Sequence, residues 1–226
     1  MVLPIGVVGL FTILSGCYAV YKLAVLGRRD KTVCTSHVNP MIAACLVLCY
    51  FLYLYLTRTL LDVFNCAPTA PPDGKLYMQA VFEECGIPGG TQVTLLPIAV
   101  VGFIVYTAGY PVGMLTLLWR NRETVMEDQL LRAKNTGNSR LTNPRAFDFR
   151  QRYQRSYYQF KPDYAYFWIV VIIVRKFFIA VTSILFNRNG AFQMAACLLV
   201  MFLAYALQVR YTPYMSPSDC DVVLRD

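Results

Sequence analysis

Five apolar stretches of about twenty residues each dominate this chain. They cover residues 3–27, 40–64, 93–119, 164–186 and 191–209. A helix rises about 1.5 Å per residue, so each stretch is long enough to cross a hydrocarbon core of roughly 30 Å. Backbone groups in lipid have no water to bind, and a helix satisfies its own amides and carbonyls. The sequence therefore predicts an all-α fold, a polytopic membrane bundle of five transmembrane helices, with residues 1–226 forming a single transmembrane domain.

Composition supports a membrane protein over a soluble one. Hydrophobic residues make up 57% of the chain and charged residues 15%, against roughly 25% charged in ordinary soluble domains. A soluble domain of this length buries one or two apolar helices, but not five. The first stretch is too long for a typical signal peptide, and Met1–Pro4 carries no charged side chain. We therefore interpret residues 3–27 as a retained helix.

Basic residues predict the orientation of the chain in the membrane. The linker 120–163 holds ten basic and five acidic residues, whereas the loop 65–92 holds only Lys75 against three acids. Short loops rich in Lys and Arg remain cytoplasmic. We expect the linker 120–163 and the C-terminus in the cytoplasm, and the loop 65–92 and the N-terminus outside. A rim this basic also favours anionic inner-leaflet lipids, at about 1 kcal/mol per charge, although topogenic charge alone explains it.

Cysteine and histidine usage constrains the chemistry. Cys66 and Cys85 both fall in the predicted extracellular loop, where a disulfide between them can persist. His37 is the single histidine, so the chain lacks a His–Ser dyad and a His-rich metal cluster. No Gly-rich phosphate loop is present. We therefore predict no enzyme, no catalytic residue, no cofactor and no metal site. Nucleic-acid binding is not expected, because the basic charge lies where topology requires it.

Arg175 and Lys176 lie near the middle of the fourth predicted span, where charge is costly and points to function. A voltage sensor repeats its arginines every third position, but Ile172 and Phe178 occupy those places. Three interpretations remain open for the pair. It is buried with carbonyl or tyrosine partners, it snorkels to the interface, or it lines a polar path for ions or lipid head groups.

Two further features lie inside predicted spans. Arg58 and Asp62 are one helical turn apart near the outer end of the second span, which predicts an intrahelical ion pair. In the third span, Pro111 removes a backbone donor and predicts a kink. Gly109 and Gly113, four residues apart, predict close helix–helix approach. A gating element and simple packing are both compatible with this pattern.

The second half of the chain resembles a known membrane family over roughly residues 109–214. The landmarks are Gly109-Tyr110-Pro111 in a span ending in Trp119-Arg120-Asn121-Arg122, the aromatic run Tyr157–Trp168 with Pro162 inside it, Arg175-Lys176, Gly190-Ala191-Phe192-Gln193, and Arg210-Tyr211-Thr212-Pro213-Tyr214. This pattern is similar to the membrane domain of the TRP-like, polycystin-related proteins of algae, oomycetes and fungi.

The resemblance implies a cation channel or a channel-associated subunit in the plasma or ciliary membrane, with ion transport as its role. It also implies that the chain is part of a larger membrane domain and associates with other membrane subunits. The alternative hypothesis is a non-conducting anchor that holds an extracellular or ciliary assembly to the membrane. Ion selectivity requires rings of carbonyls or acids at a constriction, and Asp62 is the one acid near such a position.

Overall fold

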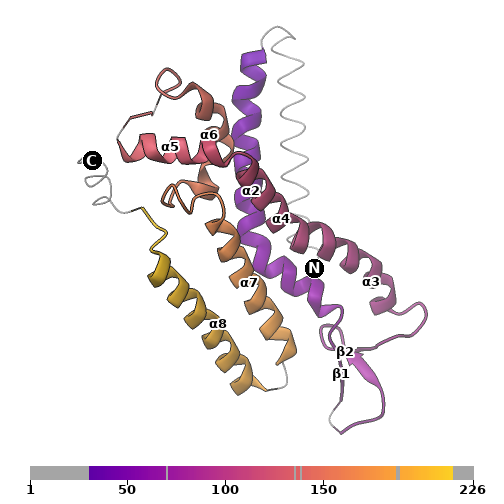
Figure 1. Cartoon of the computed structure of the whole chain (residues 1–226). Helices are drawn as coiled ribbons and strands as arrows, with labels where there is room; N and C mark the ends of the chain where they lie inside the picture. The colour runs from indigo at the N-terminus through magenta and orange to yellow at the C-terminus, as the bar shows by residue number, and fades with distance from the viewer. Residues whose placement is uncertain (1–30, 70, 135, 138, 187–188, 216–226) are drawn as a thin grey trace. The chain divides into compact units, whose positions relative to one another are not determined.

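The computed structural model describes residues 31–69, 71–134, 136–137, 139–186 and 189–215, with only the main chain described for residues 31–38. The first predicted span, residues 3–27, lies outside the described residues. Within them, four segments are long and apolar enough to cross a membrane (Figure 1). They are Asn39–Asp62, Thr91–Arg120, Trp168–Leu185 and Gly190–Tyr211. The chain is thus an integral membrane protein of the all-α class, and the count of five spans stays a prediction.

The spans differ in how regular their helices are. Helix α2 covers Lys31–Asp62 without interruption, and α8 covers Gly190–Tyr211. The segment Thr91–Arg120 consists of α3 (Thr91–Gly102), the π-helix η1 (Phe103–Ala108) and α4 (Gly109–Arg120). A π-helix in mid-span accommodates a local break in the i→i−4 ladder, and Pro111 follows closely. The π-helix ends three residues before Pro111, and the kink predicted at the proline stays a prediction.

Helix α7 (Trp168–Leu185) begins four residues later than the predicted span, which started at Tyr164. The aromatic residues before it form turns, in which the Tyr164 amide donates to the Lys161 carbonyl at 3.0 Å. Pro162 disfavours a helical conformation at Lys161, so a helix in this region cannot extend back beyond the proline. The ring of Tyr164 lies 6.0 Å from that of Trp168 and covers the first turn of α7.

Three of the four described spans bury little of their surface within the chain, whereas α7 buries more than a third of its apolar window. No residue of α8 is buried, and large side chains such as Met194, Leu198 and Phe202 are exposed along it. An apolar surface of this extent is unfavourable in water. Lipid, or other apolar helices within lipid, accounts for it.

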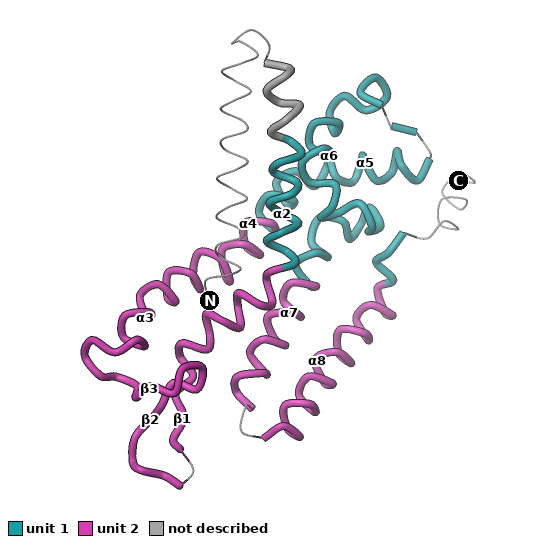
Figure 2. The backbone as a smooth tube through the Cα atoms, turned by 180° about the vertical axis from the view of Figure 1, so that it is seen from behind, with its two compact units in different colours: residues 1–51, 115–171, 212–226 teal, residues 52–114, 172–211 magenta. Residues whose placement is uncertain are grey.

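The chain divides into two compact units, coloured separately in Figure 2. Unit 1 comprises residues 1–51, 115–171 and 212–226, and unit 2 comprises residues 52–114 and 172–211. Unit 1 contains α5 (Arg122–Ala133) and α6 (Pro144–Tyr157), which pack against each other. Both lie in the predicted basic linker 120–163. Asn143 caps α6 by accepting the Ala146 amide at 3.2 Å, and Pro144 occupies the first turn, where no donor is needed.

Unit 2 contains a small antiparallel sheet that the sequence analysis did not predict. Its strands are β1 (Cys66–Pro68), β2 (Leu76–Met78) and β3 (Glu83–Glu84), in that order. Cys66 pairs with Met78, and Tyr77 pairs with Glu84. The predicted disulfide between Cys66 and Cys85 is present, with its Cα atoms 6.4 Å apart. The bridge connects the first strand to the residue directly after the third, so three very short strands form one closed loop.

Candidate functional site

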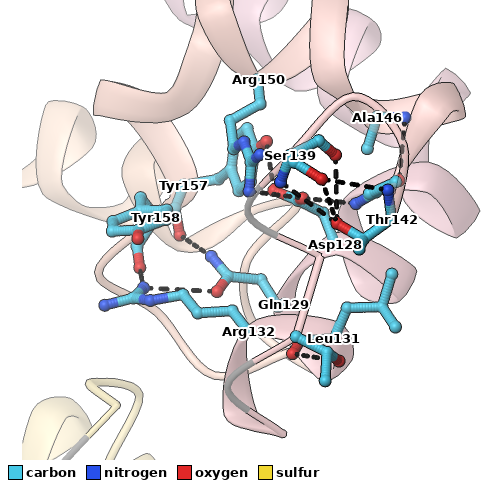
Figure 3. Close-up of polar contacts among 12 residues, drawn as sticks. Asp128, Gln129, Leu131, Arg132, Ser139, Thr142, Ala146, Arg150, Tyr157 and Tyr158 are labelled. Carbon is cyan, nitrogen blue, oxygen red and sulfur yellow. Dashed lines mark hydrogen bonds and ion pairs between the residues drawn. The ribbon is translucent and has the colours of Figure 1, made fainter.

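The most extensive buried polar cluster described lies in unit 1 around Asp128 (Figure 3). The Asp128 carboxylate, on α5, is 2% exposed and lies 3.5 Å from the Arg150 guanidinium, on α6. It accepts hydrogen bonds from the side-chain amide of Asn143 at 2.8 Å and from the Tyr157 hydroxyl at 2.9 Å. We call these four residues the Asp128 cluster. One acid thus connects α5 to the start, middle and end of α6.

Burial controls the electrostatics of the cluster. It raises the pKa of Asp128, and this effect is opposed by the Tyr157 hydrogen bond and by the positive charges of Arg150 and Arg132. Burial also raises the pKa of Tyr157 far above its usual range, and the neighbouring carboxylate adds to the shift. The phenol therefore stays protonated and remains a donor to Asp128.

A second set of contacts extends the cluster toward the end of α6. The Gln129 amide donates to the Tyr157 carbonyl at 2.8 Å, and Arg132 donates to the Tyr158 carbonyl. The Arg132 guanidinium also lies 3.4 Å from the centre of the Tyr158 ring. Among the described residues, no buried side-chain polar atom lacks a partner. A fully bonded cluster rigidifies a fold, so we assign this one to holding the basic linker in a fixed shape.

A neighbouring contact attaches α2 to the same linker. The Asn39 side chain is buried, donates to Gln151 at 3.0 Å and accepts from the Arg152 guanidinium at 2.6 Å. Asn39 is the first residue of the apolar span of α2. The start of this span is therefore fixed to α6 by two side-chain hydrogen bonds.

Unit 2 contains a smaller polar contact inside the membrane span, between α2 and η1. The Tyr53 hydroxyl donates to the Thr107 carbonyl at 2.9 Å, and the Thr57 and Thr107 hydroxyls lie 3.4 Å apart. Pro111 has no amide hydrogen and cannot donate the usual i→i−4 bond to Thr107. Tyr53 supplies a donor to that carbonyl. The three side chains of Tyr53, Thr57 and Thr107, all buried, are called the span contact below.

Close helix approach occurs at a different glycine from those predicted. A Cβ at Gly102 would lie 2.8 Å from the Leu60 side chain, so α3 and α2 approach closely there. A Cβ at Gly113 would meet no described atom within 4 Å. At Gly109 it would meet only the Ile104 carbonyl of its own span, at 3.3 Å. Gly109 and Gly113 thus face no other helix of the described chain, and their packing role stays a prediction.

The predicted charged residues occupy separate positions. Arg175 and Lys176 are half-buried neighbours near the middle of α7. Arg58 and Asp62 interact electrostatically within α2, but they form none of the ion pairs seen among the described residues. The predicted intrahelical Arg58–Asp62 ion pair therefore stays a prediction.

Sequence reasoning missed both the Asp128 cluster and the span contact. A signal for the span contact was available, because Pro111 leaves the carbonyl four residues earlier in need of another donor. No comparable signal pointed to the Asp128 cluster, whose members are spread over a polar linker. The described residues contain no group of three or more His, Cys, Asp or Glu side chains that could hold a metal ion.

Comparison with known proteins adds no further assignment. The chain matches no protein-family model, no curated protein and no solved structure.

Proposed function

We propose that this chain is a membrane domain of TRP-like type that acts as a cation channel or as a subunit associated with one. The proposal rests on two points. Residues 109–214 contain the sequence motifs that resemble the TRP-like family, and the chain is an integral membrane protein. In this proposal the linker 120–163 is cytoplasmic, the loop 65–92 is extracellular, and the membrane is plasma or ciliary. The basic linker then faces anionic inner-leaflet lipids, and further membrane subunits complete the assembly.

The observation that best supports this function is the span contact beside η1. A gating helix must change its bend at a defined point, and π-helical turns are frequent at such functional points. Here the Gly109-Tyr110-Pro111 landmark directly follows a π-helix. The Thr107 carbonyl accepts from a side chain of the neighbouring helix, so this bond is free to exchange without breaking the helix elsewhere.

Current recordings from the purified full chain in planar bilayers test the proposal. We expect cation-selective current that changes in open probability when Tyr53→Phe removes the hydroxyl of the span contact. Tyr55→Phe is the matched control, because Tyr55 is exposed two residues further along α2. Cooperative chemical denaturation in micelles confirms that each preparation is folded, and resistance to alkylation until a reductant is added confirms that the Cys66–Cys85 bridge has formed.

The second candidate function is a non-conducting anchor for an extracellular or ciliary assembly. It is favoured by the disulfide-closed sheet between α2 and α3, a rigid surface to which a further protein can attach. Absence of current from a folded preparation, with and without Tyr53→Phe, would contradict the channel and support the anchor.

A further inference from the structure

The turn between β2 and β3 exposes two large apolar side chains. We call residues 79–82 the β2–β3 tip. Within it Val81 is 49% exposed and Phe82 is 81% exposed. Phe82 also has a φ of 58°, a left-handed conformation that a bulky residue adopts only when the surrounding structure requires it. The Phe82 amide donates to the Met78 carbonyl at 2.8 Å, which fixes this conformation.

Strand register places the tip at the membrane end of the sheet. Met78, directly before the tip, pairs with Cys66, which follows the last residue of α2 by only four positions. The Gln79 amide donates to the Asn65 carbonyl at 3.2 Å, and the Asn65 side chain donates back to Gln79 at 3.3 Å. The tip is therefore attached to the chain just where α2 ends.

A second contact attaches the other side of the tip to the start of α3. The Glu83 carboxylate accepts the Thr91 amide at 3.1 Å, and Thr91 is the first residue of α3. In Figure 2 the strands lie at the end of unit 2 where α2 ends and α3 begins. The tip thus lies at the level at which two membrane spans reach the bilayer surface.

Other exposed apolar side chains lie at the same ends of α2 and α3 as the tip. Phe64, between α2 and β1, is 45% exposed, and Val93 in the first turn of α3 is also exposed. The two acids that follow the tip are already engaged, Glu83 with Thr91 and Glu84 with Lys75 at 2.7 Å. The carboxylate of Glu83 is thus held by a hydrogen bond at the start of α3 and that of Glu84 by an ion pair, so both acids are directed away from the Phe82 ring while the segment keeps negative charge.

We propose that Val81 and Phe82 insert into the interfacial layer of the leaflet nearest the end of α2 and the start of α3. Aromatic side chains prefer this layer. The strand register puts the tip beside the ends of α2 and α3, where this layer lies. The occupant is uncharged or zwitterionic lipid, because the acids beside the tip would be repelled by an anionic surface. The strained backbone at Phe82 is then the means of presenting the ring to the lipid. This inference rests on the membrane spans and not on ion conduction.

Tryptophan quenching in vesicles tests the insertion. Trp119→Phe and Trp168→Phe remove both native tryptophans of the full chain, and Phe82→Trp then places a single fluorophore at the tip. The vesicles consist of phosphatidylcholine brominated near the glycerol end of its acyl chains, so that the bromine quenches a tryptophan in the interfacial layer. The matched control is Leu76→Trp, an exposed position at the opposite end of β2. We expect quenching at least about twofold stronger at position 82 than at position 76, because only the tip reaches the interface.

Equal quenching at the two positions, or none at position 82, would overturn the proposal and make the tip a docking surface for a protein. A second pair of variants separates the ring from the backbone. Val81→Trp reports on the tip, and adding Phe82→Gly keeps the left-handed φ while removing the ring. We expect the added glycine to reduce quenching of Trp at position 81 by about half, and unchanged quenching would show that Phe82 does not insert. Cooperative chemical denaturation in micelles confirms folding of every variant, and resistance to alkylation confirms its Cys66–Cys85 bridge.

Discussion

At the scale of single residues, Asp128 is the most constrained side chain described in unit 1. Asp128→Ala leaves the Arg150 charge, the Tyr157 hydroxyl and the Asn143 amide without their common acceptor. Removing one partner of a buried ion pair costs about 3–5 kcal/mol, because the remaining charge stays buried and uncompensated. We expect a loss of this size in the free energy of unfolding, measured by chemical denaturation of the full chain in micelles.

Asp148, on the neighbouring helix α6, offers the matched control. It lies 3.9 Å from Arg140, and the two side chains are 57% and 66% exposed. An exposed pair of this kind contributes about 0–1 kcal/mol. Asp148→Ala should therefore leave stability nearly unchanged, and equal losses for the two variants would contradict the role assigned to the Asp128 cluster.

Asp73, in the β1–β2 loop, gives a prediction on pH. The Tyr77 hydroxyl donates to it at 2.7 Å, and this bond, followed by the Lys75 amide, holds the pKa of Asp73 below its usual value of 3.8. A lowered carboxyl pKa contributes stability above pH 3.8, which is lost as the pH falls through the lower folded pKa. Carboxyl NMR titration should give this low pKa, and Tyr77→Phe should raise it. If the pKa of Asp73 is the same in Tyr77→Phe as in the parent chain, another group causes the lowering.

At the scale of elements, the span contact predicts coupling between two positions on different helices. Tyr53→Phe removes the donor to the Thr107 carbonyl and should destabilise the fold by about 0.6–1.5 kcal/mol. Pro111→Ala restores an amide that can donate to the same carbonyl. In the Pro111→Ala background, Tyr53→Phe should therefore lower the free energy of unfolding by clearly less. A double-mutant cycle of unfolding free energies in micelles measures this, and strict additivity would exclude a shared acceptor.

Gly102 gives the second prediction at this scale. A side chain there meets Leu60 of α2, whereas one at Gly113 meets no described atom within 4 Å. Gly102→Ala moves only the end of a flexible side chain, but Gly102→Leu overpacks the contact. We expect Gly102→Leu to be less stable than Gly113→Leu by about 1–3 kcal/mol in micelles. The reverse order would show that Gly113, and not Gly102, makes the tighter helix contact.

Hydropathy was sufficient to predict the spans that the structure describes, because the length of an apolar run directly reflects bilayer thickness. It did not predict where η1 interrupts the segment Thr91–Arg120, since Phe103–Ala108 is as apolar as its neighbours. The Asp128 cluster was also beyond sequence reasoning. Its members Asn143 and Tyr157 are 15 and 29 residues from Asp128 in a linker without clear periodicity. Contacts at such separations depend on how α5 and α6 pack.

At the scale of the whole molecule, orientation is the property on which the proposed function depends. In a chain whose free cysteines are replaced by serine, we expect Asp73→Cys to react with a membrane-impermeant maleimide on intact cells. Leu141→Cys, at a position 94% exposed in the basic linker, should react only after permeabilisation. This pattern follows from the retention of short Arg-rich loops in the cytoplasm. Labelling of position 141 on intact cells would reverse the orientation.

The Cys66–Cys85 bridge has a consequence for how the protein can be made. The sheet it closes has strands of three, three and two residues, too short to persist without a covalent constraint. Closing a loop with a sequence separation of 19 contributes about 3 kcal/mol in the chain-entropy account. Thiols are oxidised only after this segment reaches an oxidising compartment. Synthesis under reducing conditions should therefore yield inserted helices joined by an unstructured segment, and later oxidation should complete the fold.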